Sequence, residues 1–347
     1  MSVLSKHNPA LGRQCCLVAR RAYTAPPSAP TSILAAINAI KAHPPKVIPD
    51  YLSPTPSHLL TTTISDLVGA SSSSSPVVSS PPRALPQGHH LVYFPIQLPP
   101  SRLVPDGADP DHSPGAPFSR RVWAGGEVTF RRGGLVLDCR PVVCRETIEE
   151  VSLRGKGPDE KVFVDVWRRY GLGHGREERN EWQIEERRTL VFMKEQETSP
   201  PSSSTLRLIK YPHPASHSIS LTPSPTHLFH FSALSFNAHA IHFDPLYARA
   251  VDGHRALLVH GPFTLALMLR VLTDHLGADL AVQRFTYRNH APLYVNERMA
   301  ISLRKVSSGA GEKEGEERWD VWVEGLGGGL AVKGTAVVAA KEESKSP

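Results

Sequence analysis

The fold is decided by residues 261–276, which read GPFTLALMLRVLTDHL. Pro262 stands where the first turn of a helix needs no N–H donor, and Gly277 is of the residue type that commonly ends helices. The polar residues that interrupt the apolar run are few: Thr264, Arg270, Thr273, Asp274 and His275. A helix with so few polar positions is expected to be buried on most sides rather than to lie on a surface.

Strand-like segments flank this helix on both sides. β-Branched and aromatic residues recur at strand spacing in residues 122–130, 135–143, 162–169, 187–194, 281–287, 298–306, 319–323 and 331–339. Residues 227–232 read as the start of a further strand, and residues 31–42 and 58–68 are predicted as two short helices. The sequence therefore predicts an α+β fold in which an antiparallel sheet wraps around one buried helix.

The length of 347 residues suits two domains of about 150 residues each. Serine and proline dominate residues 70–86, a composition that cannot bury a core, so we expect a disordered insertion there. A similar segment at residues 197–204 lies between two strand-rich regions and is predicted to link the domains. The expected division is an N-terminal domain over residues 24–198 and a C-terminal domain over residues 199–347.

The N-terminus has the composition of a mitochondrial import presequence. Six basic residues precede the first acidic residue, Asp50, and serine, leucine and alanine are interspersed among them. The run Arg21-Ala22-Tyr23-Thr24 resembles the cleavage sites of such presequences. We therefore expect residues 1–23 to be removed and the mature protein to reside in the mitochondrial matrix. An N-terminal arm that is disordered and never cleaved is the alternative.

Charge and hydropathy argue against two classes of function. The formal net charge of +6 falls to +2 without the four basic residues of segment 1–23, so the basic isoelectric point does not indicate nucleic-acid binding. No run approaches the roughly 18 apolar residues that a membrane-spanning helix needs. The four cysteines form neither a disulfide framework nor a zinc spacing, and Cys139 and Cys144 are predicted to point to opposite faces of a strand.

Residues 231–248, FSALSFNAHAIHFDPLYA, and residues 258–262, LVHGP, carry the specific signal of the chain. They resemble the motif of the R-specific enoyl-thioester hydratases, the MaoC-like family, in which Asp-x-Asn-Pro-x-His precedes a His-Gly turn into the hot-dog helix. Position by position, the chain has Asn237 for Asp, His239 for Asn, Ala240 for Pro and His242 for His.

The sequence of this segment is similar to the sequences of the branch that contains the fungal mitochondrial 3-hydroxyacyl-thioester dehydratases type 2 and the mesaconyl-C4-CoA hydratases. In the first half, residues 120–128, RRVWAGGEV, are similar to the signature of the same branch. The resemblance covers residues 86–340 apart from insertions. It implies a double hot-dog, two copies of an antiparallel sheet around a central helix, in which the first copy is degenerate and the second holds the chemistry.

The implied reaction is the reversible removal of water from a (3R)-hydroxyacyl thioester to give the trans-2-enoyl thioester, in mitochondrial type II fatty-acid synthesis. The substrate is expected on acyl-carrier protein or on CoA, and homodimerisation is left open. No metal, flavin or nicotinamide cofactor is implied. Mesaconyl-C4-CoA-type hydration, a non-catalytic acyl-thioester-binding module and a thioesterase are the alternatives, the last because hot-dog folds also host hydrolysis.

This chemistry assigns roles to His242, Asn237 and Gly261. His242 is the predicted base, because an imidazole with a pKa near 6.5 suits general base catalysis at neutral pH. Gly261, at the start of the buried helix, is predicted to stabilise the thioester oxyanion through its N–H. Asn237 cannot release a proton. We therefore expect His242 to perform both proton transfers while Asn237 holds the hydroxyl group, with His239 as the alternative proton donor.

Four residues are candidates for contact with the substrate: His239, His260, Arg121 and Trp123. His260 either touches the substrate or closes the turn before the helix. Arg121 and Trp123 either touch the substrate or form part of the interface between the halves. His239, His242 and Asp244 also match the ligand preferences of zinc and iron, but no further motif with metal spacing accompanies them.

Overall fold

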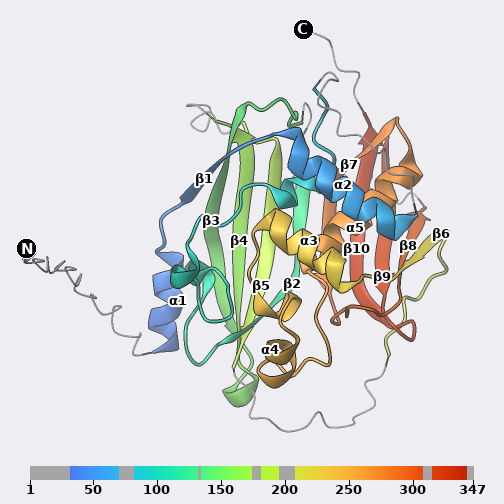
Figure 1. Cartoon of the computed structure of the whole chain (residues 1–347). Helices are drawn as coiled ribbons and strands as arrows, with labels where there is room; N and C mark the ends of the chain where they lie inside the picture. The colour runs from blue at the N-terminus through green and yellow to red at the C-terminus, as the bar shows by residue number, and fades with distance from the viewer. Residues whose placement is uncertain are drawn as a thin grey trace, which may run out of the picture.

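The computed structural model describes residues 32–69, 82–131, 134–173, 181–194, 208–307 and 315–341. These residues form a ten-stranded sheet, which Figure 1 shows with its strands standing side by side. The first half of the chain contributes β1 (Lys46–Tyr51), β2 (Arg120–Phe130), β3 (Pro141–Arg154), β4 (Lys161–Leu172) and β5 (Ile184–Met193). The second half contributes β6 (His217–Leu221), β7 (Leu280–Asn289), β8 (Met299–Val306), β9 (Glu316–Glu324) and β10 (Leu330–Ala340).

The two halves of the sheet have the same strand order. The sheet runs β1-β3-β4-β5-β2-β7-β10-β9-β8-β6, so each half, followed inward from its outer edge, places its first, third, fourth, fifth and second strand in turn. The halves meet where β2 pairs antiparallel with β7, from Gly125 opposite Arg288 to Thr129 opposite Arg284. The predicted α+β class is confirmed. The predicted boundary between residues 198 and 199 lies outside the described residues.

Helices cover one face of this sheet. They are α1 (Ile33–Lys41), α2 (Pro54–Val68), α3 (Pro225–Ser235), α4 (Pro245–Ala250) and α5 (Gly261–Leu276). In Figure 1, α2, α3 and α5 cross in front of the strands. Helix α5 is the helix that the sequence predicts, and it buries nine of its side chains. None of the described helices is both long and apolar enough to cross a bilayer.

The inner face of the first half carries a row of alternating charges. Lys46, Glu146, Arg168 and Glu186 stand opposite one another in register across β1, β3, β4 and β5. Nε of Arg168 lies 3.2 Å from a Glu146 oxygen, and both glutamates are buried. Burial opposes the ionisation of Glu186, but its basic neighbours nevertheless hold its pKa below the usual range. The row thus meets the general requirement that buried charges be paired.

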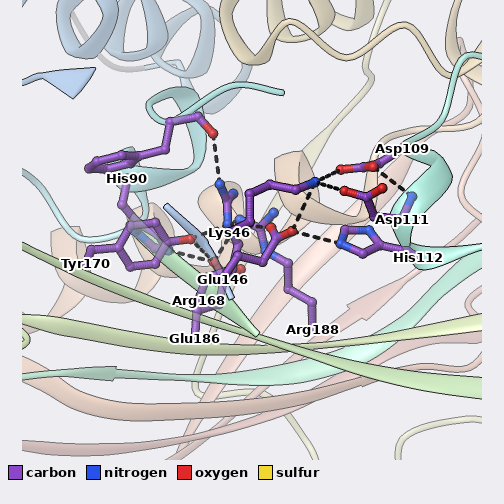
Figure 2. Close-up of polar contacts among 11 residues, drawn as sticks. Lys46, His90, Asp109, Asp111, His112, Glu146, Arg168, Tyr170, Glu186 and Arg188 are labelled. Atoms are coloured by element: carbon purple, nitrogen blue, oxygen red, sulfur yellow. Dashed lines mark hydrogen bonds and ion pairs between the residues drawn. The ribbon is translucent and has the colours of Figure 1, made fainter. Parts of the chain in front are cut away.

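The segment that precedes β2 covers this row with polar groups instead of an apolar helix. His112 shares a hydrogen bond with Glu146, with 2.9 Å between Nε2 and Oε1, and Arg168 donates to the Phe94 carbonyl over 2.8 Å. Figure 2 shows these groups gathered over the strands, with the Lys46 ammonium group directed at Asp109 and Asp111. The core of the first half is therefore built partly from ion pairs.

The prediction of a strand start at residues 227–232 is wrong, because these residues lie within α3. Ser224 caps this helix by accepting a hydrogen bond from the His227 N–H, and Pro225 occupies its first turn. These capping signals outweigh the local aromatic composition that suggested a strand. β1 and β6, the short strands at the two edges of the sheet, are not predicted from the sequence either.

The predicted strand over residues 135–143 is wrong in its first part, because β3 begins only at Pro141. Cys139 adopts a φ of 62°, which breaks the extended chain, so Cys139 and Cys144 do not share a strand. The predicted insertion at residues 70–86 is also too long: the Leu85 N–H donates to the Leu135 carbonyl. Residues 70–81 and the predicted linker at residues 197–204 lie outside the described residues.

Candidate active site

His242 ends a short 3₁₀ segment, Ala240–His242, between α3 and α4. Its Nδ1 lies 2.9 Å from the Leu258 carbonyl oxygen, which can only accept a hydrogen bond, so Nδ1 carries the proton. The lone pair then belongs to Nε2. Burial, reinforced by the neighbouring His260, holds the pKa of His242 well below 6.5. His242 is therefore neutral at physiological pH, in the protonation state that a general base requires.

Two further histidines hold the His242 ring in place. His260 stacks on it, with 3.7 Å between ring centroids, and His239 meets it edge-on at 5.4 Å. His260 is fully buried, and its Nε2 is 2.8 Å from the Ser232 hydroxyl oxygen. Burial lowers the pKa of His260 to about 3, so no second positive charge forms beside His242 at neutral pH.

Asn237 follows the C-terminus of α3. Phe236 takes the left-handed conformation at φ 51°, and the Asn237 N–H then donates to the Ser232 carbonyl. The side-chain oxygen of Asn237 accepts a hydrogen bond from the His239 N–H over 3.0 Å. A carboxylate in this position could make the same turn. Asn237 lines the cavity, and among the described residues its side-chain NH2 group donates no hydrogen bond, so that group is available as a donor.

Asp106, from the first half, was not identified by the sequence analysis. One of its oxygens lies 3.2 Å from Nε2 of His239, and both side chains are buried. The close approach depends on Gly107, because a Cβ there would lie 1.9 Å from the Ala238 carbonyl oxygen. The Asp-Gly pair was visible as a turn signal, but nothing local in the sequence connects it with a histidine more than a hundred residues away.

Gly261 opens α5, so its N–H has no partner within that helix. Trp123 packs directly against it: a Cβ on Gly261 would lie 3.1 Å from the indole. The indole N–H donates to the Tyr287 hydroxyl, and the Trp123 carbonyl accepts from Asn289. Trp123 thus ties β2 of the first half to β7 of the second half and to the start of α5.

The three predicted catalytic residues line one cavity of about 740 Å³, together with Arg121 and Trp123. Residues of both halves form its walls. Among the described residues that line this cavity are neither His239 nor His260, whose side chains are buried behind His242. The predicted residues therefore form two layers: those that line the cavity, and His239 and His260, which are buried next to His242. For His239 and His260 this geometry favours a packing role rather than contact with the substrate.

The three residues considered as metal ligands have other partners. His242 bonds to the Leu258 carbonyl, His239 faces Asp106, and the Asp244 carboxylate caps α4 by accepting from the Leu246 and Tyr247 N–H groups.

A second group with possible ligand atoms, Asp109, His112 and Glu146, has those atoms within 4.8 Å of one another. The Lys46 ammonium lies 2.9 Å from Asp109 and 3.8 Å from Glu146. Lys46 thus supplies the positive charge that a metal ion would bring, and the group is accounted for as an ion-pair cluster.

Comparison with known proteins identifies the family. The sequence profile of hydroxyacyl-thioester dehydratase type 2 matches residues 88–295, more than half of the chain. The chain belongs to this family. As a member of the hydroxyacyl-thioester dehydratases type 2, it is a hydro-lyase, which confirms the predicted class of enzyme.

Relatives of this dehydratase occur in fungi and bacteria. The mitochondrial hydroxyacyl-thioester dehydratase type 2 of Schizosaccharomyces pombe is 28% identical over 283 residues, covering 76% of this chain and 91% of the relative. The protein of the same description from Saccharomyces cerevisiae is 27% identical, covering 67% of this chain and 81% of the relative. The mesaconyl-C(4)-CoA hydratase of Chloroflexus aurantiacus is 30% identical, covering 64% and 74% respectively.

Solved structures establish the fold of the dehydratase. A MaoC-like dehydratase from Phytophthora capsici aligns with a TM-score of 0.60 at 14% identity, covering 88% of this chain and 99% of that one. HtdX from Mycobacterium tuberculosis aligns with a TM-score of 0.52 at 17% identity, covering 84% and 99%. Together with the repeated strand order, these matches confirm the predicted double hot-dog fold.

Proposed function

We propose that this chain removes water from (3R)-hydroxyacyl thioesters to give trans-2-enoyl thioesters, and that it also catalyses the reverse hydration. The observation that carries the proposal is the state of His242. Its Nδ1–H is engaged by the Leu258 carbonyl, which leaves a neutral Nε2 in a residue that lines the cavity beside Asn237 and the start of α5.

These groups suit a syn elimination. Nε2 of His242 takes the proton from C2, while the Gly261 N–H, aided by the dipole of α5, receives the charge that develops on the thioester oxygen. The imidazolium then returns the proton to the departing hydroxyl group, which leaves as water. Asn237 holds that hydroxyl group through its amide N–H. His239, the alternative donor, is directed at Asp106 and does not line the cavity within the described chain.

The finer role that we propose is mitochondrial type II fatty-acid synthesis in the matrix. The relatives from both yeasts are mitochondrial by name, and residues 1–23 lack acidic side chains and are rich in arginine. N-terminal sequencing of the protein isolated from mitochondria should give a start near Tyr23. An intact Met1 in the matrix pool would contradict import with cleavage.

A single assay separates this reaction from two others. Purified mature protein is mixed with a 3-hydroxyacyl-CoA while enoyl absorbance and free thiol are followed together. Enoyl formation without thiol release is expected. Thiol release would indicate a thioesterase, and binding of the thioester without either product would indicate a non-catalytic module.

The identity to a mesaconyl-C(4)-CoA hydratase supports a second candidate substrate, a dicarboxylic enoyl-CoA. Comparing kcat/KM for that substrate with the values for a 3-hydroxyacyl-CoA and a 3-hydroxyacyl carrier protein ranks the three. Sedimentation of the mature protein tests the homodimer, which remains a prediction.

A further inference from the structure

Arg121 differs from the neighbouring arginines of the described chain in how its guanidinium group is engaged. Arg120 donates to the Asp252 carbonyl over 2.7 Å, and Arg188 donates to Glu186 over 2.7 Å. In the part of the chain that the structure describes, no hydrogen bond or ion pair engages the Arg121 guanidinium, although this residue lines the cavity that contains His242. Its N–H donors are therefore available to a molecule bound in the cavity.

A free guanidinium in this place constrains what can bind. Burial lowers the pKa of Arg121, while Asp106 and Asp109 oppose that effect from a distance, and arginine stays protonated in proteins. When an acyl thioester displaces solvent from the cavity, leaving this cation without an acceptor is strongly unfavourable. The bound substrate must therefore place an oxygen atom against Arg121.

The position of Arg121 indicates which oxygen atom of the substrate it contacts. Trp123, which packs on Gly261, is two residues further along β2, so about 7 Å of strand separates Arg121 from it. The thioester oxygen is assigned to the Gly261 N–H, beside which Trp123 rather than Arg121 packs. Arg121 lines the cavity together with Asn237 and His242. Asp106, one of the two carboxylates whose charges act on Arg121, lies 3.2 Å from His239, and the His239 N–H donates to Asn237, so Arg121 belongs to the Asn237 side of the base. Phosphates of the carrier are excluded because the whole pantetheine arm separates them from the thioester.

We infer that Arg121 is a catalytic residue of the dehydration. Its guanidinium, together with the Asn237 amide, donates hydrogen bonds to the C3 hydroxyl oxygen and stabilises the negative charge that develops there as the C3–O bond breaks. This inference rests on the proposed function. The first half of the chain, which the resemblance implies to be a degenerate copy, thereby supplies a group to the reaction of the second half.

The electrons and protons balance without a further reactant. Nε2 of His242 removes the C2 proton, the C2–H electron pair becomes the second bond between C2 and C3, and the C3–O pair leaves with the oxygen. The proton on Nε2 then converts the leaving hydroxide to water. Arg121 remains protonated throughout, so it does not replace the acid that Asn237 lacks. By stabilising the charge on the departing oxygen, it lowers the barrier that the imidazolium must overcome as the proton donor.

The first test compares Arg121→Gln, Arg121→Lys and the control Arg131→Gln in the mature enzyme with 3-hydroxybutyryl-CoA. Arg131 lies just beyond β2, is exposed and pairs with Glu185 at the surface. Loss of one preorganised donor predicts a fall in kcat of about 10²- to 10³-fold for Arg121→Gln with little change in KM. Arg121→Lys should recover part of the rate, and Arg131→Gln should match the wild type.

The second test changes the leaving group. A 3-chlorobutyryl thioester loses chloride, a stable anion that needs less hydrogen bonding than hydroxide, so Arg121→Gln should slow this elimination less than tenfold. His242→Ala should slow both eliminations, because both require removal of the C2 proton. An equal loss for hydroxide and chloride would show that Arg121 does not act on the leaving group, and would overturn the inference.

Two other results are decisive. If Arg121→Gln and Arg121→Lys, both with wild-type melting temperatures, keep the wild-type kcat for 3-hydroxybutyryl-CoA but fail with an acyl chain that ends in a carboxylate, Arg121 binds that carboxylate and the inference is wrong. If the wild-type enzyme forms no enoyl product at all, the proposed function fails.

Discussion

The two halves of the sheet share a strand order but differ in the side chains of one row across their strands. In the second half, Ile219, Ile301, Val323 and Val332 stand in register across β6, β8, β9 and β10, beneath the apolar helix α5. In the first half, the strands with the same places in the order carry Lys46, Glu146, Arg168 and Glu186. The same topology is thus compatible with an apolar row and with a charged one.

The two rows differ in how well they tolerate amino-acid substitution. An apolar row is stabilised by burial itself and tolerates changes that preserve volume. A buried charged row gains little net free energy, because desolvation offsets the attraction, and it becomes strongly destabilising when one member is lost. The second half should therefore tolerate conservative substitution in its row, whereas the first half should not.

The largest expected effect is a difference in kcat between variants of two histidines that line the same cavity, one from each half. His242→Ala should abolish turnover, because general acid–base catalysis contributes about 10²- to 10⁴-fold for each proton transfer and His242 serves two. His112→Ala, which removes the partner of Glu146, should change kcat less than tenfold. The measurement is kcat for enoyl formation, with circular dichroism to confirm folding. Similar losses in both variants would mean that the halves share the acid–base chemistry.

The next effect is on stability. Glu186→Gln leaves Arg188 without its carboxylate partner, removes a negative charge that also acts on Arg168, and should lower the free energy of unfolding by about 3–5 kcal/mol. Ile301→Val, in the apolar row, should cost about 0.5–1.5 kcal/mol. Denaturant unfolding of both variants measures the contrast. Equal costs would remove the distinction drawn between the two rows.

Acidification should destabilise both halves through histidines rather than through the charged row. Burial lowers the pKa of His89, in the first half, and of His260, in the second, to about 3. Below about pH 6.5 the unfolded chain binds these protons and the folded chain does not, so stability falls as the pH decreases, by up to about 1.4 kcal/mol per unit for each histidine.

Glu146 and Glu186 of the charged row stay ionised between pH 7 and pH 4, because their basic neighbours keep the pKa values of both carboxyl groups low despite burial. Urea midpoints between pH 7 and pH 4 should therefore decrease steadily, and His89→Phe should reduce the slope. A flat profile would contradict the assignment of buried neutral histidines.

Between the two predicted catalytic side chains, His242 and Asn237, the smaller expected effect is at Asn237. Asn237→Ala removes a hydrogen bond to the hydroxyl group, worth about 1–3 kcal/mol, and should reduce kcat far less than His242→Ala does. Asn237→Asp should retain activity or alter its pH dependence, since a carboxylate can accept the same hydrogen bond from the His239 N–H. Loss of activity in Asn237→Ala as large as that in His242→Ala would show that orientation of the hydroxyl group dominates the reaction.

The sequence predicted the parts of the molecule whose signals are local. Helix α5 was found with correct ends because Gly261, Pro262 and Gly277 mark them, and the motif around His242 was read from adjacent residues. Helix α3 is not predicted, because its signal lies in the cap at Ser224, outside residues 227–232, whose aromatic side chains are typical of a strand.

The pairing of Asp106 with His239 could not be predicted, because it depends on how two distant loops dock. The state of Arg121 could not be predicted either, because a sequence shows that an arginine is present but not whether a carboxylate pairs with it. Within the described residues Arg121 forms no ion pair, although the charges of Asp106 and Asp109 act on it.

The repeated strand order also has a consequence for how the protein can evolve. In a homodimer of single hot-dogs, every substitution appears twice, related by the symmetry axis, so both subunits must accept it. Here both copies belong to one chain, and the seam between β2 and β7 joins two sequences that vary independently. A charged row can then arise on one side and an apolar helix persist on the other, leaving a single asymmetric cavity between unlike walls.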